Sequence, residues 1–149
     1  MIYTPLTIKA MKLAYKAHEG QYDQSGVPYI FHPVHVAEQM DDEITTCIAL
    51  LHDVLEDTSV TASELEQEFP REVTCAVLLL THDPSEDYAE YVKRLCANPL
   101  ARKVKIADIA HNTDETRLSG TKPAPKQLEH WRAKYALAKK IIKEAEAKD

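Results

Sequence analysis

The stretch Leu50-Leu51-His52-Asp53-Val54-Leu55-Glu56-Asp57 places four ionisable side chains inside an otherwise apolar segment. Around it, apolar residues recur at the spacing of one helix face, which predicts a single helix from about Glu43 to Asp57. Glu56 and Asp57 lie three or four residues after His52 and Asp53, so they are expected on neighbouring parts of that helix.

This group of charges needs compensation, because an ionised side chain is costly to bury without a partner. A divalent cation is an efficient partner, and imidazole together with carboxylate suits manganese, iron or zinc. For this segment alone, a helix C-terminus with solvated acids and a capping histidine remains a second interpretation.

Two other segments carry the same kind of signal. Asp108 lies in the apolar stretch Lys105–Asn112, and His32 precedes Pro33 at an expected helix start. Alone, Asp108 is more typical of a solvated helix face, and His32 is more typical of a packed or capping histidine. Together with His52 and Asp53 they make a mixed nitrogen and oxygen ligand set. Such a set can leave positions open for water or phosphate, which is typical of a catalytic metal site.

The rest of the chain predicts an all-α fold. The three glycines lie where helices are expected to end, three prolines stand at expected helix starts, and no strong β-alternation occurs. Residues 1–149 are predicted to be a single domain whose C-terminal helix, at about 124–147, packs on the bundle. Other helices are expected at about residues 7–19, 32–40 and 85–97. A short helix capped by Thr61 is expected to end near Phe69, another follows Pro70, and another starts at Asn98-Pro99.

Composition narrows the classes of function. The net charge of −6 argues against broad nucleic-acid binding. No apolar run approaches the about 20 residues that span a bilayer, and the N-terminus lacks the pattern of a signal peptide. Cys47, Cys75 and Cys96 form no CxxC motif and are expected to be free thiols. We therefore expect a cytoplasmic protein without membrane or nucleic-acid partners; its oligomeric state stays open.

These motifs resemble the HD phosphohydrolase superfamily, and within it the hydrolase domain of the Rel/Spo family and the small alarmone hydrolases. The resemblance runs from about residue 8 to 118 and rests on residues 17–21, 25–33, 50–58, 104–108 and 112. It implies a compact HD-domain helical bundle with one metal site between helices. It also implies a manganese-dependent enzyme that removes the 3′-pyrophosphate from guanosine tetra- or pentaphosphate.

Carried over residue by residue, the resemblance assigns three sets of side chains. The metal ligands become His32, His52, Asp53 and Asp108. The catalytic acid pair becomes Glu56 and Asp57, which position or activate the attacking water. The residues that it implies for contact with a phosphorylated nucleotide are Ser25, Lys105 and Asn112. To these we add Arg117, which lies just beyond Asp108 and Asn112, as a candidate cation for the substrate.

The chain departs from the alarmone hydrolases at positions where they usually carry a basic residue. Asp23, Gln24 and Ile109 stand there instead. Each lost charged contact would cost about 1.5–3 kcal/mol of binding free energy. Three functions therefore stay open: an alarmone pyrophosphohydrolase, an HD phosphatase for another phosphorylated nucleotide or cofactor, and a non-catalytic nucleotide sensor.

Overall fold

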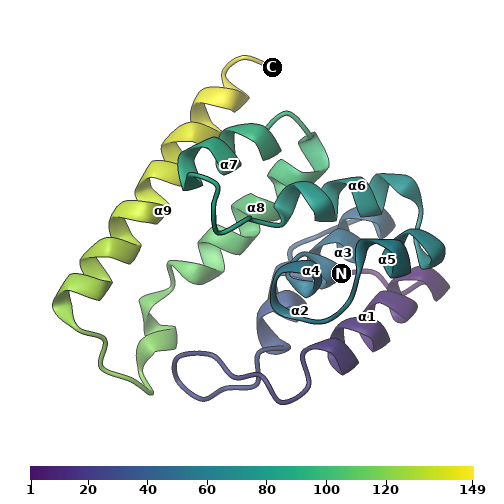
Figure 1. The fold of residues 1–149 in the computed structure, drawn as a ribbon, viewed down its shortest axis with the longest axis horizontal. Coiled ribbons are helices and arrows are strands. Elements are labelled where there is room, and N and C mark those ends of the chain that lie inside the picture. Colours follow the sequence, from purple (N-terminus) through teal and green to yellow (C-terminus); the bar gives the residue numbers. More distant parts are fainter.

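The structure, a computed structural model, describes residues 1–149 and contains nine α-helices, one short 3-10 helix and no strand (Figure 1). The predicted all-α fold is confirmed. The elements are α1 (Pro5–Ala17), α2 (Phe31–Glu38), α3 (Glu43–Leu51), α4 (Val54–Asp57), α5 (Ala62–Glu68), α6 (Arg71–Leu80), α7 (Tyr88–Leu95), α8 (Pro99–Asn112), η1 (Glu115–Leu118) and α9 (Pro125–Glu146).

The predicted continuous helix from Glu43 to Asp57 is wrong, because the chain breaks at His52 and Asp53. The His52 ring nitrogen Nδ1 lies 2.6 Å from the carbonyl oxygen of Ala49. In an unbroken helix that oxygen would accept from the N–H of Asp53, four residues later. The side chain thus replaces a backbone partner, and α4 starts as a separate turn that carries Glu56 and Asp57.

Local capping signals fix most helix starts. The side chains of Thr4, Asp42 and Asn98 each accept a hydrogen bond from a backbone N–H in the first turn of the following helix. The helix predicted from residue 85 starts only at Tyr88, because Asp87 caps that turn. Residues 83–86 form a tight turn before it.

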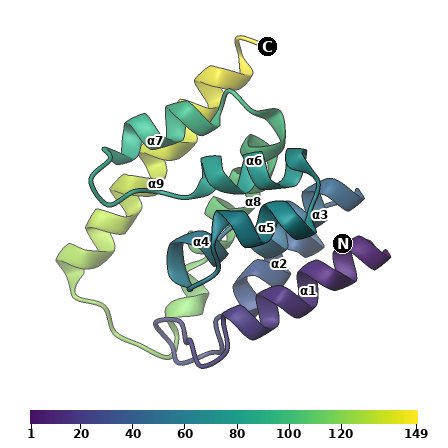
Figure 2. The same ribbon diagram turned by 45° about the vertical axis from the view of Figure 1, so that its right-hand side comes forward.

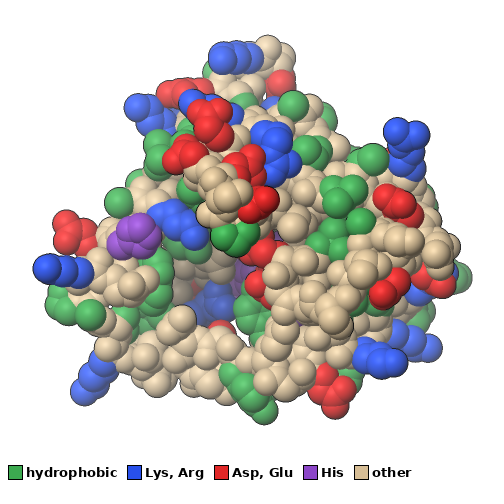
Figure 3. Space-filling model, in the orientation of Figure 1, with side chains coloured by type: hydrophobic (Ala, Val, Ile, Leu, Met, Phe, Trp, Pro, Cys, Tyr) green, Lys and Arg blue, Asp and Glu red, His purple; other side chains and the backbone are tan.

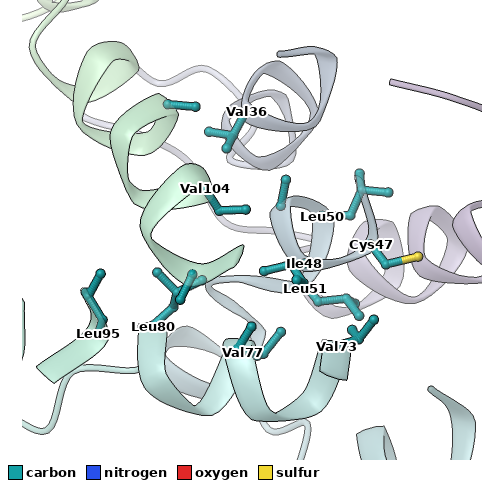
Figure 4. Close-up of a cluster of buried hydrophobic side chains, with 14 of the residues drawn as sticks. Val36, Cys47, Ile48, Leu50, Leu51, Val73, Val77, Leu80, Leu95 and Val104 are labelled. Carbon is teal, nitrogen blue, oxygen red and sulfur yellow. The ribbon is translucent and has the colours of Figure 1, made fainter. Parts of the chain in front are cut away.

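Helix α3 lies at the centre of the core, in contact with α1, α2, α6 and α8. In Figure 4, apolar side chains from several of these helices point toward one another; among them Ile48, Leu51, Val77 and Val104 are fully buried. The same apolar cluster extends to α9 through Ala138, Ile141 and Ile142. One connected core therefore joins the first helix to the last.

The helices lie on two sides of a hollow on one face of the molecule. Figures 1 and 2 both show α9 at the opposite side of the molecule from α1, with α7 alongside it. The face in Figure 3 is hollowed between α9 and α4, and acidic, basic and histidine side chains are visible within it. None of the helices combines the length and the apolar character needed to cross a membrane.

Candidate metal centre

Three of the predicted ligands converge at the helix break. His32 is in the first turn of α2, while His52 and Asp53 form the junction between α3 and α4. One potential ligand atom from each lies within 4.8 Å of the other two. Nε2 of His52 is 3.1 Å from Asp53 Oδ2, and Nε2 of His32 is 3.6 Å from the same oxygen. This spacing suits three side chains that share one metal ion.

Asp108 reaches the same point from the middle of α8. Its Oδ1 is 2.9 Å from Nε2 of His32 and 3.4 Å from Nε2 of His52. Its other oxygen accepts from Lys105 Nζ at 2.8 Å, and Asn112 donates to Oδ1 at 3.0 Å. The buried carboxylate is thus held in place by both of its neighbours on α8.

Both imidazoles are oriented by the nitrogen that faces away from the cluster. Nδ1 of His52 bonds to the Ala49 carbonyl, and Nδ1 of His32 shares a hydrogen bond of 2.8 Å with Nδ1 of His111. Metal-binding histidines commonly have their second nitrogen fixed in this way. Nε2 of His52 is buried and makes no hydrogen bond. A divalent cation would satisfy this orphaned atom, so the donor set fits a metal ion.

The charges within the cluster depend on one another. Burial would lower the pKa of His52, but Asp53 and Asp108 outweigh burial and raise the pKa well above its usual value. Burial would likewise raise the pKa of Asp108, but Lys105, the hydrogen bond with His32 and the nearby His52 lower it well below its usual value. The protein therefore keeps Asp108 ionised, as a metal ligand must be.

Glu56 and Asp57 lie beside this cluster, with carboxylate oxygens within 4.8 Å of Asp53 and of each other. Burial raises the pKa of Glu56, although a hydrogen bond of 2.7 Å from the N–H of His82 opposes the shift. Burial, then Asp53, then Glu56 raise the pKa of Asp57 to about 7. An acid with a pKa near neutrality can exchange protons with water at working pH.

Two neighbouring cavities adjoin the cluster. The first, of about 240 Å³, is lined by three of the predicted ligands, His32, Asp53 and Asp108, and by the acid pair, and we call it the metal cavity. The second, of about 470 Å³, is lined mainly by aromatic and polar residues, and we call it the adjoining cavity. Tyr29, Asn112 and Tyr135 line both. A ligand could therefore extend from one cavity into the other.

The predicted nucleotide contacts separate into two groups. Lys105 and Asn112 line the metal cavity, and Arg117 lines the adjoining cavity. Ser25 lines neither; its hydroxyl donates to the Arg117 carbonyl at 2.5 Å and accepts from the N–H of Gly120 at 3.1 Å. A Cβ at Gly120 would meet Ser25 at 2.7 Å, so this close contact requires glycine.

The three residues that differ from the alarmone hydrolases lie in two different parts of the structure. Asp23 and Gln24 line the adjoining cavity, whereas Ile109 is buried in the core. Asp23 Oδ2 lies 3.7 Å from the Arg117 guanidinium. The cation named as a replacement is therefore already paired with an acid.

Sequence reasoning missed several side chains that line the metal cavity. Tyr29 donates to Asp53 Oδ2 at 2.5 Å, and His82, Tyr88, Lys134 and Tyr135 complete the wall. A signal for Lys134 was available, because it follows Trp131 by three residues and precedes Ala138 by four. It therefore lies on the inward stripe of α9, where a lysine is unusual.

A family profile and a solved structure both match this chain. The HD domain family profile matches residues 10–81. A solved structure of a metazoan ortholog of SpoT that hydrolyses ppGpp superposes with a TM-score of 0.81, covering 95% of this chain and 88% of that one, at 22% identity. This likeness shows the fold.

Curated relatives match in sequence. The bifunctional (p)ppGpp synthase/hydrolase SpoT of Escherichia coli is 38% identical over 124 residues, which cover 70% of this chain and 18% of the relative. The guanosine-3′,5′-bis(diphosphate) 3′-pyrophosphohydrolase of Borreliella burgdorferi is 46% identical over 69 residues, covering 44% of this chain and 10% of the relative. The chain thus spans less than a fifth of these relatives. It carries an HD domain and is homologous to part of the SpoT and Rel guanosine polyphosphate 3′-pyrophosphohydrolases.

Proposed function

We propose that this protein is a metal-dependent phosphohydrolase that removes the 3′-pyrophosphate from guanosine tetra- or pentaphosphate or from a related nucleotide. The observation that carries the proposal is the convergence of His32, His52 and Asp53 on one point, with an orphaned imidazole nitrogen directed into it. The relatives that bear the pyrophosphohydrolase name add support.

In this proposal His32, His52, Asp53 and Asp108 hold one divalent cation, for which manganese is the candidate. Such an ion, when bound, supplies Lewis-acid stabilisation of phosphate charge and lowers the pKa of water. The chain's own contribution is to fix both imidazoles through Ala49 and His111. Lys105 keeps Asp108 ionised.

Glu56 and Asp57 are proposed as the groups that orient the attacking water and accept its proton. Their raised pKa values support this role, because a carboxylate with a higher pKa is a stronger base. Asn112 is proposed to contact the sugar, since it lies where the two cavities meet. Arg117 would contact the nucleotide farther out. The role proposed for Ser25 is to hold this wall together.

We also propose that residues 1–149 form one hydrolase domain. The apolar core extends without interruption from Ala10 in α1 to Ile142 in α9. Separation of α9 would expose part of that core and remove Lys134 and Tyr135 from the metal cavity. The long last helix is therefore proposed to be part of the catalytic unit.

The pairing of Asp23 with Arg117 favours a second candidate, an HD phosphatase for a different phosphorylated nucleotide or cofactor. Asp23 places negative charge where the alarmone hydrolases usually have a cation, and it occupies the one arginine of the adjoining cavity. A substrate with fewer phosphates beyond the scissile group would suit this cavity better.

A substrate panel separates these candidates. Manganese-loaded protein would be incubated with guanosine tetraphosphate and with other phosphorylated nucleotides and cofactors, and pyrophosphate and phosphate release would be measured. Pyrophosphate release from guanosine tetraphosphate supports the first candidate, and release only from another compound supports the second. No turnover by fully metallated protein would refute both enzymes and favour a nucleotide sensor.

A further inference from the structure

Lys134 directs a cation into the metal cavity without a carboxylate partner. Its Nζ lies 4.6 Å from the ring centre of Tyr88 and 5.4 Å from that of Tyr135, and no carboxylate oxygen lies within 4.0 Å. The side chain is half-buried on α9. Two aromatic rings thus hold the ammonium group by cation–π contact while leaving its hydrogen-bond donors unpaired.

Tyr88 adds a second unsatisfied donor to the same wall. Its hydroxyl oxygen is buried and has no hydrogen-bond partner in the protein, although the residue lines the metal cavity. A buried hydroxyl without a partner is unusual and costs free energy. A ligand that accepts hydrogen bonds would remove this cost.

The second lysine of the cavity does not compete for this role. Lys105 is nearly buried and is bound to Asp108 at 2.8 Å, over the ring of Tyr91. Lys134 is therefore the cation that remains free for a ligand. The charge of the cavity agrees: a divalent ion and the two lysines carry four positive charges, which balance Asp53, Glu56, Asp57 and Asp108 when all four are ionised. The metal-loaded cavity would then not repel an anion.

Position separates these two donors from the metal ligands. Lys134 comes from α9 and Tyr88 starts α7, whereas the ligands come from α2, the α3–α4 junction and α8. Figures 1 and 2 show α7 and α9 together on one side of the molecule, with α4 across the hollow seen in Figure 3. An anion of more than one phosphate group could therefore be held from both sides.

We propose that Lys134 and Tyr88 form an anion subsite for the phosphate group that the metal ligands do not reach, namely the second phosphate of a pyrophosphate group. The inference rests on the proposed function and deepens it, because it assigns the preference for a pyrophosphate over a single phosphate to these two residues. Neither lies within the segment matched by the HD domain profile.

The experiment measures binding of inorganic pyrophosphate and inorganic phosphate to the manganese-loaded full chain by titration calorimetry. The variants are Lys134→Met, Lys134→Arg and Tyr88→Phe, with Lys140→Met, an exposed lysine of the same helix, as the matched control. Metal content and thermal unfolding of every variant are recorded, so that loss of the fold or of the metal is recognised.

We expect the wild-type protein to bind pyrophosphate more tightly than phosphate. Lys134→Met should weaken pyrophosphate binding by about tenfold or more, as expected for loss of a charged hydrogen bond, and change phosphate binding by less than about twofold. Tyr88→Phe should weaken pyrophosphate binding by about two- to tenfold, and Lys134→Arg should retain part of the preference. Lys140→Met should match the wild type.

Unchanged pyrophosphate affinity in metallated Lys134→Met, or an equal loss for phosphate and pyrophosphate, would overturn the subsite. So would a wild-type protein that binds neither anion. Failure of the proposed function has a different signature, which is absence of nucleotide turnover by metallated wild-type protein. An active wild-type enzyme whose Lys134→Met variant keeps its pyrophosphate preference would refute the subsite alone.

Discussion

The two neighbouring cavities differ in the side chains that line them. In the metal cavity, Asp108 lies within hydrogen-bonding distance of both His32 and Lys105, and all three are buried. The adjoining cavity has about twice the volume, and its aromatic side chains surround one arginine that is paired with Asp23. On the proposed function, the metal cavity holds the reacting phosphate groups and the adjoining cavity the rest of the nucleotide. Changes at the ligands or the acid pair should then abolish the reaction, and changes in the adjoining cavity should alter which nucleotide is accepted.

The largest expected effect comes from the ligands. His52→Ala or Asp53→Ala should lose bound manganese and lower turnover by at least about 100-fold, because both effects depend on the same ion. Metal analysis after gel filtration and a pyrophosphate-release assay measure the two together. His130→Ala, at an exposed histidine of α9, is the control. Normal metal content in both ligand variants would refute the proposed ligand set.

Glu56→Gln separates metal binding from turnover within the metal cavity. The amide oxygen can still accept from the N–H of His82, so the local structure should persist. Turnover should fall by about 10²–10⁴-fold, the usual contribution of a general base, while metal content stays normal. Glu129→Gln, at an exposed acid of α9, serves as the control. Full activity of Glu56→Gln would remove this residue from the mechanism.

Asp23→Asn tests the adjoining cavity. The asparagine oxygen can keep the bonds from the N–H groups of Ser25 and Val27, but the charge that pairs with Arg117 disappears. The KM for guanosine tetraphosphate should fall by about three- to tenfold, as expected for one partly buried charged contact. kcat and metal content should stay within about twofold, since the change is remote from the ligands. A drop in kcat with unchanged KM would contradict the separation of the two cavities.

The smallest effect is on stability and concerns Asp57. Its pKa of about 7 in the folded protein lies above the usual value, so folding favours the protonated form. The metal-free protein should lose stability as pH rises from about 4 through 7, because the unfolded chain ionises first. Asp57→Asn removes this loss and should raise the Tm by about 2 °C more at pH 8 than at pH 5.

Thermal unfolding at the two pH values measures this difference. Manganese should reduce it, because a nearby cation favours the ionised carboxylate. An equal change in Tm at both pH values would show that Asp57 has an ordinary pKa in the folded protein.

The spacing of apolar residues and the positions of glycine and proline predicted much of the fold. Apolar spacing indicated the helices, and Gly20, which adopts a positive φ of 82°, follows the end of α1 as expected. The break at His52 could not be predicted, because it depends on an imidazole that competes with the backbone for one carbonyl. The short η1 helix depends on Asp114, whose side chain accepts from the N–H of Thr116.

The candidate site, too, could be predicted from the sequence only in part. The three segments that carry His32, His52–Asp53 and Asp108 could be named from residue type and surroundings, and the structure brings them together. That they bind an ion stays a prediction. The spacing of α9 placed Lys134 on its inward stripe, but its pairing with Tyr88 could not be predicted, because the packing of α9 against α7 depends on contacts between distant parts of the chain.

The contact between Ser25 and Gly120 joins two loops that are 95 residues apart in the chain. Few hydrogen bonds hold these loops together, whereas α3 lies inside the apolar core. Segments held by few buried contacts open locally at a small fraction of the global unfolding free energy. The loops that carry Ser25 and Gly120 should therefore exchange their amide hydrogens while α2, which carries His32, and α3, which ends next to His52, stay closed.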